Sequence, residues 1–481
     1  MSEKIDAQIK KATKWSAITE IVVKLVTPIS SMVLARLLTP EAFGIVATLN
    51  MVITFAEIFT DAGFQKYLIQ HEFKDDRDRD ESTNVAFWSN LIMSMIIWGI
   101  IAIFNEPLAR IVGNPGLGYV LVIACVSIPL AAFSSIQRAL YKRDFDFKTL
   151  FKVRIVGVLV PLVVTIPLAL WLRSFWALVV GTICVNAMNA VLLTVFSKWR
   201  PRLFYSFAKL KEMLSFTIWS MIEAITIWLT SYVDVFIVGT MLSQYYLGLY
   251  KTSSTLVGQI MGLITATTTP ILFSALSRLQ DDKSEFERLF FRFQKIVGLL
   301  VIPLGVGIFI FSDFVTNILL GGQWMEASWF VGLWALTGAL TIVLAHYSSE
   351  VYRAKGRPKL SVLAQVLHIA VLWPTVLIAV KYGFEVLCVS RSLVRLQSIV
   401  VNLFIVGIAI KMNIGKMVTN ILPSLVASAS MLLVMLLPPA ESISLIVLYI
   451  LLAIAIYLFV IVLFPEERKI VLNLKYYLLT K

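Results

Sequence analysis

The sequence predicts an all-α integral membrane protein with about 14 transmembrane helices. We expect two parallel six-helix repeats that form N- and C-lobes around a central cleft, followed by two extra C-terminal helices. Three observations predict this fold: an apolar composition, many apolar runs of about 20 residues, and short motifs that recur at a nearly constant offset. Of the 481 residues, 59% are hydrophobic and only 15% are charged, and the mean hydropathy is +0.85. Soluble proteins carry about 25% charged residues, so an ordinary soluble protein is excluded.

The apolar runs, separated by charged residues and Gly or Pro breaks, mark the expected spans. A helix of about 20 residues crosses a hydrocarbon core roughly 30 Å thick, whereas barrel strands alternate over about 10 residues. We expect helices near residues 12–36, 41–69, 82–104, 118–140, 149–171, 174–198, 211–238, 244–274, 291–312, 327–352, 358–381, 384–410, 417–437 and 442–464. An even number of spans places both termini on one side of the membrane.

The basic residues indicate which side that is. The loops on the side of the termini hold 34 of the 42 lysines and arginines, and the opposite loops hold four. Cytoplasmic loops are enriched in these residues, so the sequence predicts a multi-pass membrane protein with both termini cytoplasmic. The net charge of +13 is then a consequence of topology, and we expect no nucleic-acid partner. The basic N-terminus has no cleavage-site pattern, so we expect the first span to be retained.

Motifs for catalysis or metal binding are missing from the sequence. Three cysteines lie inside apolar runs, and three histidines form no spacing typical of a metal site, so we expect neither a metal nor an organic cofactor. Walker, GxSxG and HExxH patterns do not occur, and we expect no catalytic residue and no enzyme activity. A membrane glycosyltransferase or ligase is the alternative from the enzyme class, but the short external loops disfavour it.

An internal repeat organises the chain. LTPEAFGIV at Leu38–Val46 matches LSQYYLGLY at Leu242–Tyr250 with an offset of 204, and IFNEPLARIVG at Ile103–Gly113 resembles IFSDFVTNILLG at Ile310–Gly321. We therefore expect an N-lobe at 1–205 with spans 1–6, a C-lobe at 206–411 with spans 7–12, and spans 13–14 with a cytoplasmic tail at 412–481. Parallel lobes around a site near the bilayer midplane are typical of alternating access.

Ionisable side chains within the spans are the site candidates, because each costs about 2.5–3.5 kcal/mol at bilayer depth and generally faces a partner or water. The cations expected to line the cleft and bind substrate are Lys24, Lys251, Arg391 and Arg395. The acids that are candidates for coupling to Na⁺ or H⁺ are Glu223, Asp234, Glu57 and Asp61. Glu20 and Lys24 are spaced as an i,i+4 pair that could simply neutralise itself. Threonines and serines on the same faces are more simply read as helix-packing groups.

Several turns of the sequence resemble a known family. ARLLTPEAFGIVA at 35–47, DAGFQKYLI at 61–69, VDVFIVGTMLSQYYLGLY at 233–250, LLGGQWMEA at 319–327 and YRAKGRPKL at 352–360 are similar to polysaccharide-repeat flippases. These belong to the multidrug/oligosaccharidyl-lipid/polysaccharide exporter superfamily, and the colanic acid, teichuronic acid and O-antigen exporter type is the most similar. The resemblance covers about residues 10–410.

The resemblance implies a flippase that carries an undecaprenyl-pyrophosphate-linked oligosaccharide from the cytoplasmic to the periplasmic leaflet. It also implies a polysaccharide polymerase and export machinery as partners beside the lipid bilayer. Lysines would then attract the diphosphate as point charges, and arginines could bind it bidentately. One departure is that the spans hold six acids against four bases, which does not establish a cationic cleft. A multidrug cation exporter of the same superfamily remains an alternative, although twelve spans are usual there, and a structural scaffold for glycan assembly is another.

Overall fold

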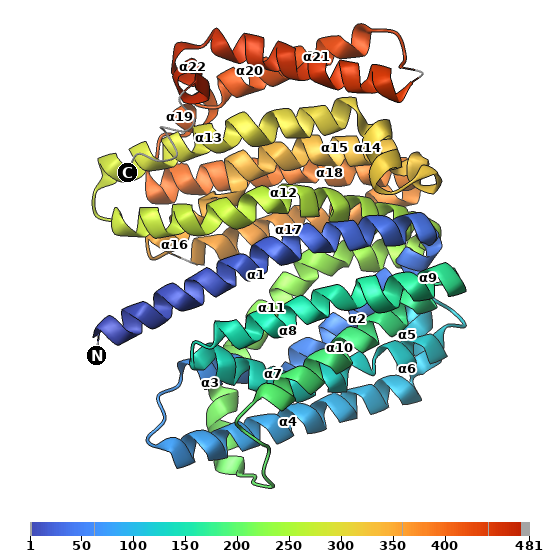
Figure 1. The fold of residues 1–481 in the computed structure, drawn as a ribbon, viewed down its shortest axis with the longest axis vertical. Coiled ribbons are helices and arrows are strands. Elements are labelled where there is room, and N and C mark those ends of the chain that lie inside the picture. The colour runs from blue at the N-terminus through green and yellow to red at the C-terminus, as the bar shows by residue number, and fades with distance from the viewer. Residues whose placement is uncertain (1, 62, 358, 441, 473–481) are drawn as a thin grey trace. The chain divides into compact units, whose positions relative to one another are not determined.

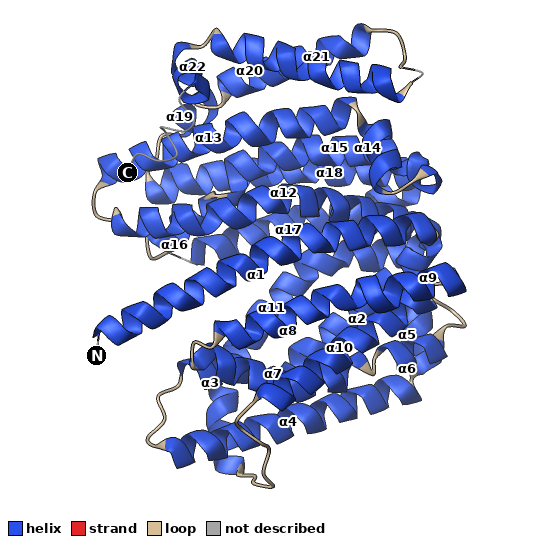
Figure 2. Ribbon diagram, in the orientation of Figure 1, coloured by secondary structure: helices blue, strands red, loops and turns tan. Residues whose placement is uncertain are grey.

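The computed structural model describes residues 2–61, 63–357, 359–440 and 442–472. Every regular element in these ranges is helical (Figure 2). Among the described residues, fourteen helical segments are long and apolar enough to cross a membrane, and each overlaps one of the spans expected from the sequence. The prediction of an all-helical membrane fold with 14 spans is therefore confirmed.

The chain divides by its internal contacts into two compact units, Met1–Lys251 and Thr252–Lys481, with the boundary inside one long helix. The lobe boundaries expected near residues 205 and 411 rest on sequence similarity and stay a prediction. Helices of the first unit (blue to green in Figure 1) are α1 (Ser2–Leu37), α2 (Pro40–Asp61), α3 (Phe64–Gln70), α4 (Asp76–Ile103), α5 (Asn105–Ile111), α6 (Gly118–Ala124), α7 (Ser127–Arg143), α8 (Phe147–Val160), η1 (Pro161–Thr165), α9 (Ile166–Leu172), α10 (Trp176–Phe196), α11 (Phe207–Met241) and the start of α12 (Gln244–Arg278).

The second unit continues α12 and contains the remaining helices. They are α13 (Lys283–Ile310), α14 (Ser312–Leu319), η2 (Gly322–Ala327), α15 (Ser328–Thr341), η3 (Ile342–His346), α16 (Ser348–Ala354), α17 (Lys359–Ala379), η4 (Val380–Tyr382), α18 (Phe384–Ile405), η5 (Val406–Ile410), α19 (Ile414–Thr419), α20 (Leu422–Ser430), η6 (Met431–Leu436), α21 (Ile443–Val462) and α22 (Pro465–Leu472). Three of the short segments, η1, η3 and η5, have π-helical geometry and lie within long spans.

Local sequence explains where several helices begin and end. The side chains of Asp75 and Asp146 accept the backbone N–H groups of Asp78 and Thr149, which caps the N-termini of α4 and α8. Arg173 adopts a left-handed conformation (φ 47°) and ends α9. These caps fix the ends at which the polar loops connect neighbouring spans.

Apolar side chains form a separate core in each unit. In the first unit, α2 packs against α4, α6, α7 and α10 through buried residues that include Leu49, Ile128 and Val179. In the second unit, the last two spans pack on α13, where the Tyr457 hydroxyl donates to the carbonyl oxygen of Leu299 at 2.8 Å. The two extra C-terminal helices are thus part of the second unit's core.

Candidate functional site

The matched turns of the internal repeat meet each other in the first unit. A Cβ atom on Gly44 would overlap the carbonyl oxygen of Gln244, and a Cβ atom on Gly248 would overlap the carbonyl oxygen of Pro40. Pro40 corresponds to Gln244, and Gly44 to Gly248, at the offset of 204 seen in the sequence. Equivalent residues that contact each other reciprocally are typical of a two-fold relation. The start of α2 and the start of α12 therefore cross at a point where only glycine fits.

The second pair of matched motifs occupies similar turns. Gly113 follows α5 with φ 82°, and Gly321 follows α14 with φ 102°, both in the left-handed region that favours glycine. Gly113 also packs closely on Gly239 of α11 and accepts a hydrogen bond from Gln244 Nε2 at 2.7 Å. These contacts join α5, α11 and α12 at the end of the spans where the connecting loops hold few lysines and arginines.

The predicted cleft lysines both lie in the first unit. Lys24 is half-buried on α1, and Glu20 one turn earlier is exposed. Lys251 is half-buried, and its Nζ lies 5.1 Å from the centre of the Tyr232 ring. That distance is within the range of a cation–π contact. The ammonium group of Lys251 therefore lies over an aromatic ring of α11.

Asp234, a predicted ion-coupling residue, has structural partners. Its side chain is buried, and Oδ2 accepts a hydrogen bond from the Tyr250 hydroxyl at 2.6 Å. Oδ1 accepts the backbone N–H of Val235 at 2.8 Å. The bond from Tyr250 holds α11 to α12 near their turn, so the carboxylate has a packing role whether or not it also couples to an ion.

The predicted cleft arginines lie together in the second unit, on one face of α18. The Arg395 guanidinium carbon lies 4.0 Å from the centre of the Trp334 ring, and its Nη1 donates to the Trp334 carbonyl oxygen at 2.8 Å. Arg391 lies over the same indole at 5.2 Å. A stacked guanidinium that also binds a backbone carbonyl stabilises the packing of α18 on α15. The structure thus places this pair against an aromatic partner on a neighbouring helix.

The predicted site residues are divided between the units. Lys24, Lys251, Glu57 and Asp234 belong to the first unit, and Arg391 and Arg395 belong to the second. The side chains of Asp61 and Glu223 lie outside the described residues. A joint role for the four cations, and an ion-coupling role for the four acids, therefore stay predictions.

Glu57 lines a cavity of about 320 Å³ inside the first unit. The cavity lies at the end of the spans where the loop cations concentrate, which we call the basic end. Two of its lining residues, Lys66 of α3 and Arg138 of α7, were counted in the sequence only as loop cations. Sequence spacing did signal a polar face on α7, because Ser134 and Ser135 each lie about one helical turn before Arg138.

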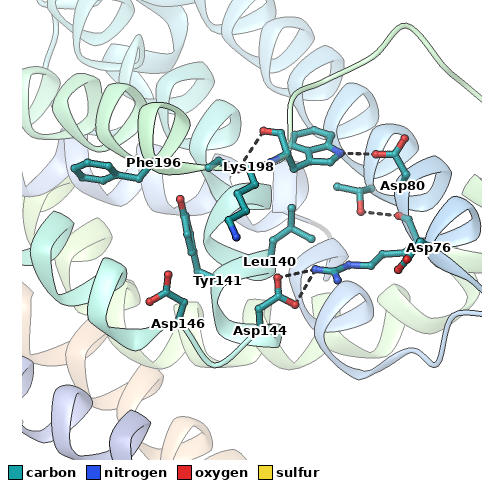
Figure 3. A pocket seen from close by; sticks show the side chains of 12 residues that line it. Asp76, Asp80, Leu140, Tyr141, Asp144, Asp146, Phe196 and Lys198 are labelled. Carbon is teal, nitrogen blue, oxygen red and sulfur yellow. Dashed lines mark hydrogen bonds and ion pairs between the residues drawn. The ribbon is translucent and has the colours of Figure 1, made fainter. Parts of the chain in front are cut away.

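A second cavity at the basic end, of about 500 Å³, is shown in Figure 3. Arg79 Nη2 donates to both carboxylate oxygens of Asp144 at 2.8 Å, and the Trp199 indole N–H donates to Asp80 at 3.0 Å. These polar groups hold α4, α7 and the segment after α10 together. Asp80 and Asp144 therefore already serve as structural acceptors beside this cavity.

Lys209 of α11 anchors the same end. Its Nζ lies 2.5 Å from Asp78 Oδ1 and 3.2 Å from Glu81 Oε2, both on α4. Burial opposes the charged ammonium, but the hydrogen bonds to the two carboxylates more than offset it and raise the pKa of Lys209 above its usual value. The basic end of α11 is thus fixed to α4 by an ion-pair network.

Comparison with curated proteins places the chain among polysaccharide biosynthesis proteins. It is 21% identical over 431 residues to the teichuronic acid biosynthesis protein TuaB of Bacillus subtilis (strain 168), covering 89% of this chain and 88% of TuaB. It is also 21% identical over 371 residues to the lipopolysaccharide biosynthesis protein WzxC of Escherichia coli (strain K12), covering 76% of this chain and 74% of WzxC.

Comparison with solved structures shows the fold. The inward closed conformation of the lipid II flippase MurJ superposes with a TM-score of 0.72 at 14% identity, covering 94% of this chain and 98% of MurJ. An inward-facing multidrug resistance transporter of the MATE family, from the MOP superfamily, gives a TM-score of 0.60 at 13% identity, covering 85% of this chain and 99% of that transporter. The names of these two proteins are those of a flippase and a transporter, and the fold is what this chain shares with them. The family described as "Polysaccharide biosynthesis protein" matches residues 33–329, more than half of the chain, and the protein therefore belongs to that family.

Proposed function

We propose that this protein translocates an undecaprenyl-pyrophosphate-linked oligosaccharide repeat unit from the cytoplasmic to the periplasmic leaflet by alternating access. The observation that carries the proposal is the combination of a polysaccharide biosynthesis family with the fold of a lipid-linked precursor flippase. The names of TuaB and WzxC, which refer to teichuronic acid and lipopolysaccharide, support a glycan substrate.

Elementary chemistry supports a carrier for such a substrate. Sugar hydroxyls and a pyrophosphate lose their hydration in hydrocarbon, and each unpaired polar group costs several kcal/mol, about 2–7. A polyprenyl tail, in contrast, is apolar and is stable in the lipid phase. A protein that shields only the headgroup therefore removes the main barrier to crossing.

The residues assigned to this task follow from charge. Lys24, Lys251, Arg391 and Arg395 would attract the diphosphate, since charge-assisted hydrogen bonds are about twice as strong as neutral ones. The acids Glu57, Asp61, Glu223 and Asp234 are the candidates for Na⁺ or H⁺ coupling. The protein would sit in the bacterial inner membrane with both termini in the cytoplasm, because the basic end of the spans carries 34 of the 42 lysines and arginines.

The proposal is tested with the purified protein in liposomes that contain a fluorescent polyprenyl-diphosphate oligosaccharide. A membrane-impermeant glycosidase added outside reports the fraction of substrate in the outer leaflet. We expect faster exposure of substrate than in protein-free liposomes, and exposure about tenfold slower with Lys251→Met, because one charge-assisted hydrogen bond is lost. Lys381→Met, at an exposed position in the last turn of its span, is the matched control. Equal exposure with and without the wild-type protein would refute the proposal.

A multidrug cation exporter is the second candidate, because the MATE transporter shares the fold. Spans 13 and 14 speak against it, since twelve spans are usual there. Cells that lack this protein would become sensitive to cationic dyes while keeping a normal surface glycan if the second candidate were correct. Loss of surface glycan with unchanged dye resistance supports the flippase.

A further inference from the structure

Residues 197–206, which we call the linker, connect α10 to α11 and lie against α4. The linker is irregular and joins the last span of the predicted N-lobe to the first span of the predicted C-lobe. The backbone N–H of Arg202 donates to Asn84 Oδ1 at 2.6 Å, and the Arg202 carbonyl oxygen accepts from the Trp88 indole at 2.8 Å. These two bonds fix the middle of the linker at the level of residues 84–88 of α4.

Side chains of the linker also hold it in place. Trp199 and Phe204 pack against the core cluster that contains Phe87, and the rings of Phe87 and Trp199 lie 5.6 Å apart. The hydroxyl groups of Tyr205 and Ser89 lie 3.0 Å apart, at hydrogen-bond distance. The remaining side chains of the linker are therefore held at defined positions on α4, unlike those of a free loop.

Two large apolar side chains at this surface are exposed. Leu203 is 94% exposed, and Phe207, the first residue of α11, is 79% exposed. The Phe207 ring meets the Tyr205 ring edge to face, with 5.3 Å between the ring centres. Contact of such side chains with water forgoes the free energy of burying them. An apolar surrounding for this surface would recover that free energy.

The level of the linker on α4 identifies this surrounding as the edge of the bilayer. α4 has charged residues up to Glu81 and none after it. A hydrocarbon core roughly 30 Å thick takes about 20 residues of helix, and that length counted back from Ile103 ends at Asn84. Leu203 follows Arg202, which is bonded to Asn84, so it lies where hydrocarbon meets headgroups. The exposed side chains of α4 on the hydrocarbon side of this level are all apolar, as a face in contact with lipid requires: Ile92, Met93, Met95, Ile96, Ile100 and Ile103.

Basic side chains accompany the exposed apolar ones. Residues 197–211 include five lysines or arginines and no acid. Arg202 directly precedes Leu203, Lys211 lies one helical turn after Phe207, and both basic side chains are exposed. The other three lie against acids, backbone carbonyls or the cavity of Figure 3: Lys209, Arg200 and Lys198. Arg202 and Lys211 are therefore the two cations of this surface that can meet a lipid headgroup.

The acids next to these two cations are bonded within the first unit. Asp80 accepts from the Trp199 indole at 3.0 Å and lies 3.5 Å from the Arg202 guanidinium. Glu212, beside Lys211 on α11, accepts from a tyrosine hydroxyl of α3 at 3.1 Å. A guanidinium has five N–H donors and an ammonium group has three, so both cations keep donors for a phosphate group.

We propose that the linker and the start of α11 form an interfacial anchor that binds anionic phospholipids of the leaflet at the basic end of the spans. Leu203 and Phe207 enter the edge of the hydrocarbon, and Arg202 and Lys211 bind headgroup phosphates. Lipid is the occupant because the apolar exposed face of α4 continues directly to this surface. The anchor gives the bilayer a contact with the connection between the two predicted lobes, and it does not depend on which substrate the protein carries.

The test uses a bimane fluorophore attached at the proposed lipid contact. Leu203→Cys and Phe207→Cys are labelled separately in a Cys184→Ala background, because the other two cysteines are buried. Arg77→Cys is the matched control. Position 77 is exposed on the same helix to which the linker is bonded, and it lies two turns before Asn84, about 10 Å further from the hydrocarbon.

The purified protein is placed in phosphatidylcholine vesicles that contain nitroxide-labelled phosphatidylglycerol or nitroxide-labelled phosphatidylcholine. We expect both lipids to quench the two test positions and to leave Arg77→Cys unquenched. Half-maximal quenching should need about fivefold less phosphatidylglycerol than phosphatidylcholine, since a basic residue near an anionic surface contributes about this factor. Arg202→Gln combined with Lys211→Gln should abolish the preference. Lys148→Gln, at an exposed position at the start of α8, should retain it.

Quenching of the test positions no stronger than that of Arg77→Cys would overturn the proposal, because this surface would then face water. Protection of both positions from nitroxide lipids and from iodide in solution would also overturn it, since a second copy of the protein would then cover them. Equal quenching by the two lipids would overturn the assignment to anionic headgroups. Leu203 and Phe207 are both exposed, so neither substitution removes a core contact, and the two positions check each other.

Discussion

The reciprocal glycine crossing allows a quantitative prediction for one methyl group. In Gly44→Ala the added Cβ would overlap the Gln244 carbonyl oxygen, with the carbonyl carbon at 2.8 Å and the Gly248 nitrogen at 3.1 Å. These are backbone atoms, so relief requires α2 and α12 to move apart, at the upper end of the cost of overpacking, about 3 kcal/mol. Alanine regains about 1 kcal/mol of helix propensity. The net loss of about 2 kcal/mol should lower the midpoint of thermal unfolding by about 4–8 °C for a unit of this size.

The assay is thermal unfolding of the purified protein in detergent, followed by intrinsic fluorescence. Gly99→Ala is the control, because a Cβ at Gly99, within α4, meets nothing within 4 Å. Its midpoint should stay the same or rise. Gly248→Ala should resemble Gly44→Ala, and the double variant should cost less than the sum of the two, since one separation of the helices relieves both overlaps. Equal midpoints for Gly44→Ala and Gly99→Ala would refute the reasoning.

Two further predictions concern charged groups. Arg395→Ala should lower the unfolding midpoint and the amount of inserted protein, because it removes both the stacking on Trp334 and the hydrogen bond to its carbonyl; Arg395→Lys, which keeps the charge but not the planar group, should recover only part of the loss. Export lost at unchanged protein level would contradict this packing role and leave only the diphosphate-binding role proposed above for Arg395. The N–H of Gly116 and then the Arg110 side chain lower the pKa of Glu106 below its usual 4.5, so its stabilising effect is present above that pH and is lost as the pH falls through the lowered value. The difference in unfolding midpoint between wild type and Glu106→Gln should therefore be present at neutral pH and disappear in acid, and a difference that persists in acid would contradict this.

The number and type of elements could be predicted because they depend on local sequence. Each span is a run of apolar residues interrupted by charges, and a helix in lipid must satisfy its own backbone hydrogen bonds. The same holds for the turns, where Gly113 and Gly321 occupy matched positions with positive φ. The sequence did not reveal that two of the loops predicted to be external contain α5 and α14, because a helix of seven or eight residues leaves too weak a periodic signal.

The polar residues were harder to assign, because their partners come from distant parts of the chain. The ion-coupling role expected of Asp234 stays a prediction, and the structure adds that its carboxylate accepts from Tyr250 on the next helix. The cleft position expected of Arg395 likewise stays a prediction, and the structure adds that its guanidinium lies on Trp334. Periodicity gives the face of a helix on which such a residue lies, but not what that face meets.

The sequence by itself determined the membrane fold, the count of spans and the repeat that relates Gly44 to Gly248, because hydropathy and short turn motifs are read one segment at a time. Only the tertiary structure decided that these two glycines cross reciprocally and that Lys66 and Arg138 line one cavity together with Asn90. The physical reason is that a cavity or a close crossing is formed by surfaces from helices far apart in the chain, and no single segment carries the shape of its neighbour.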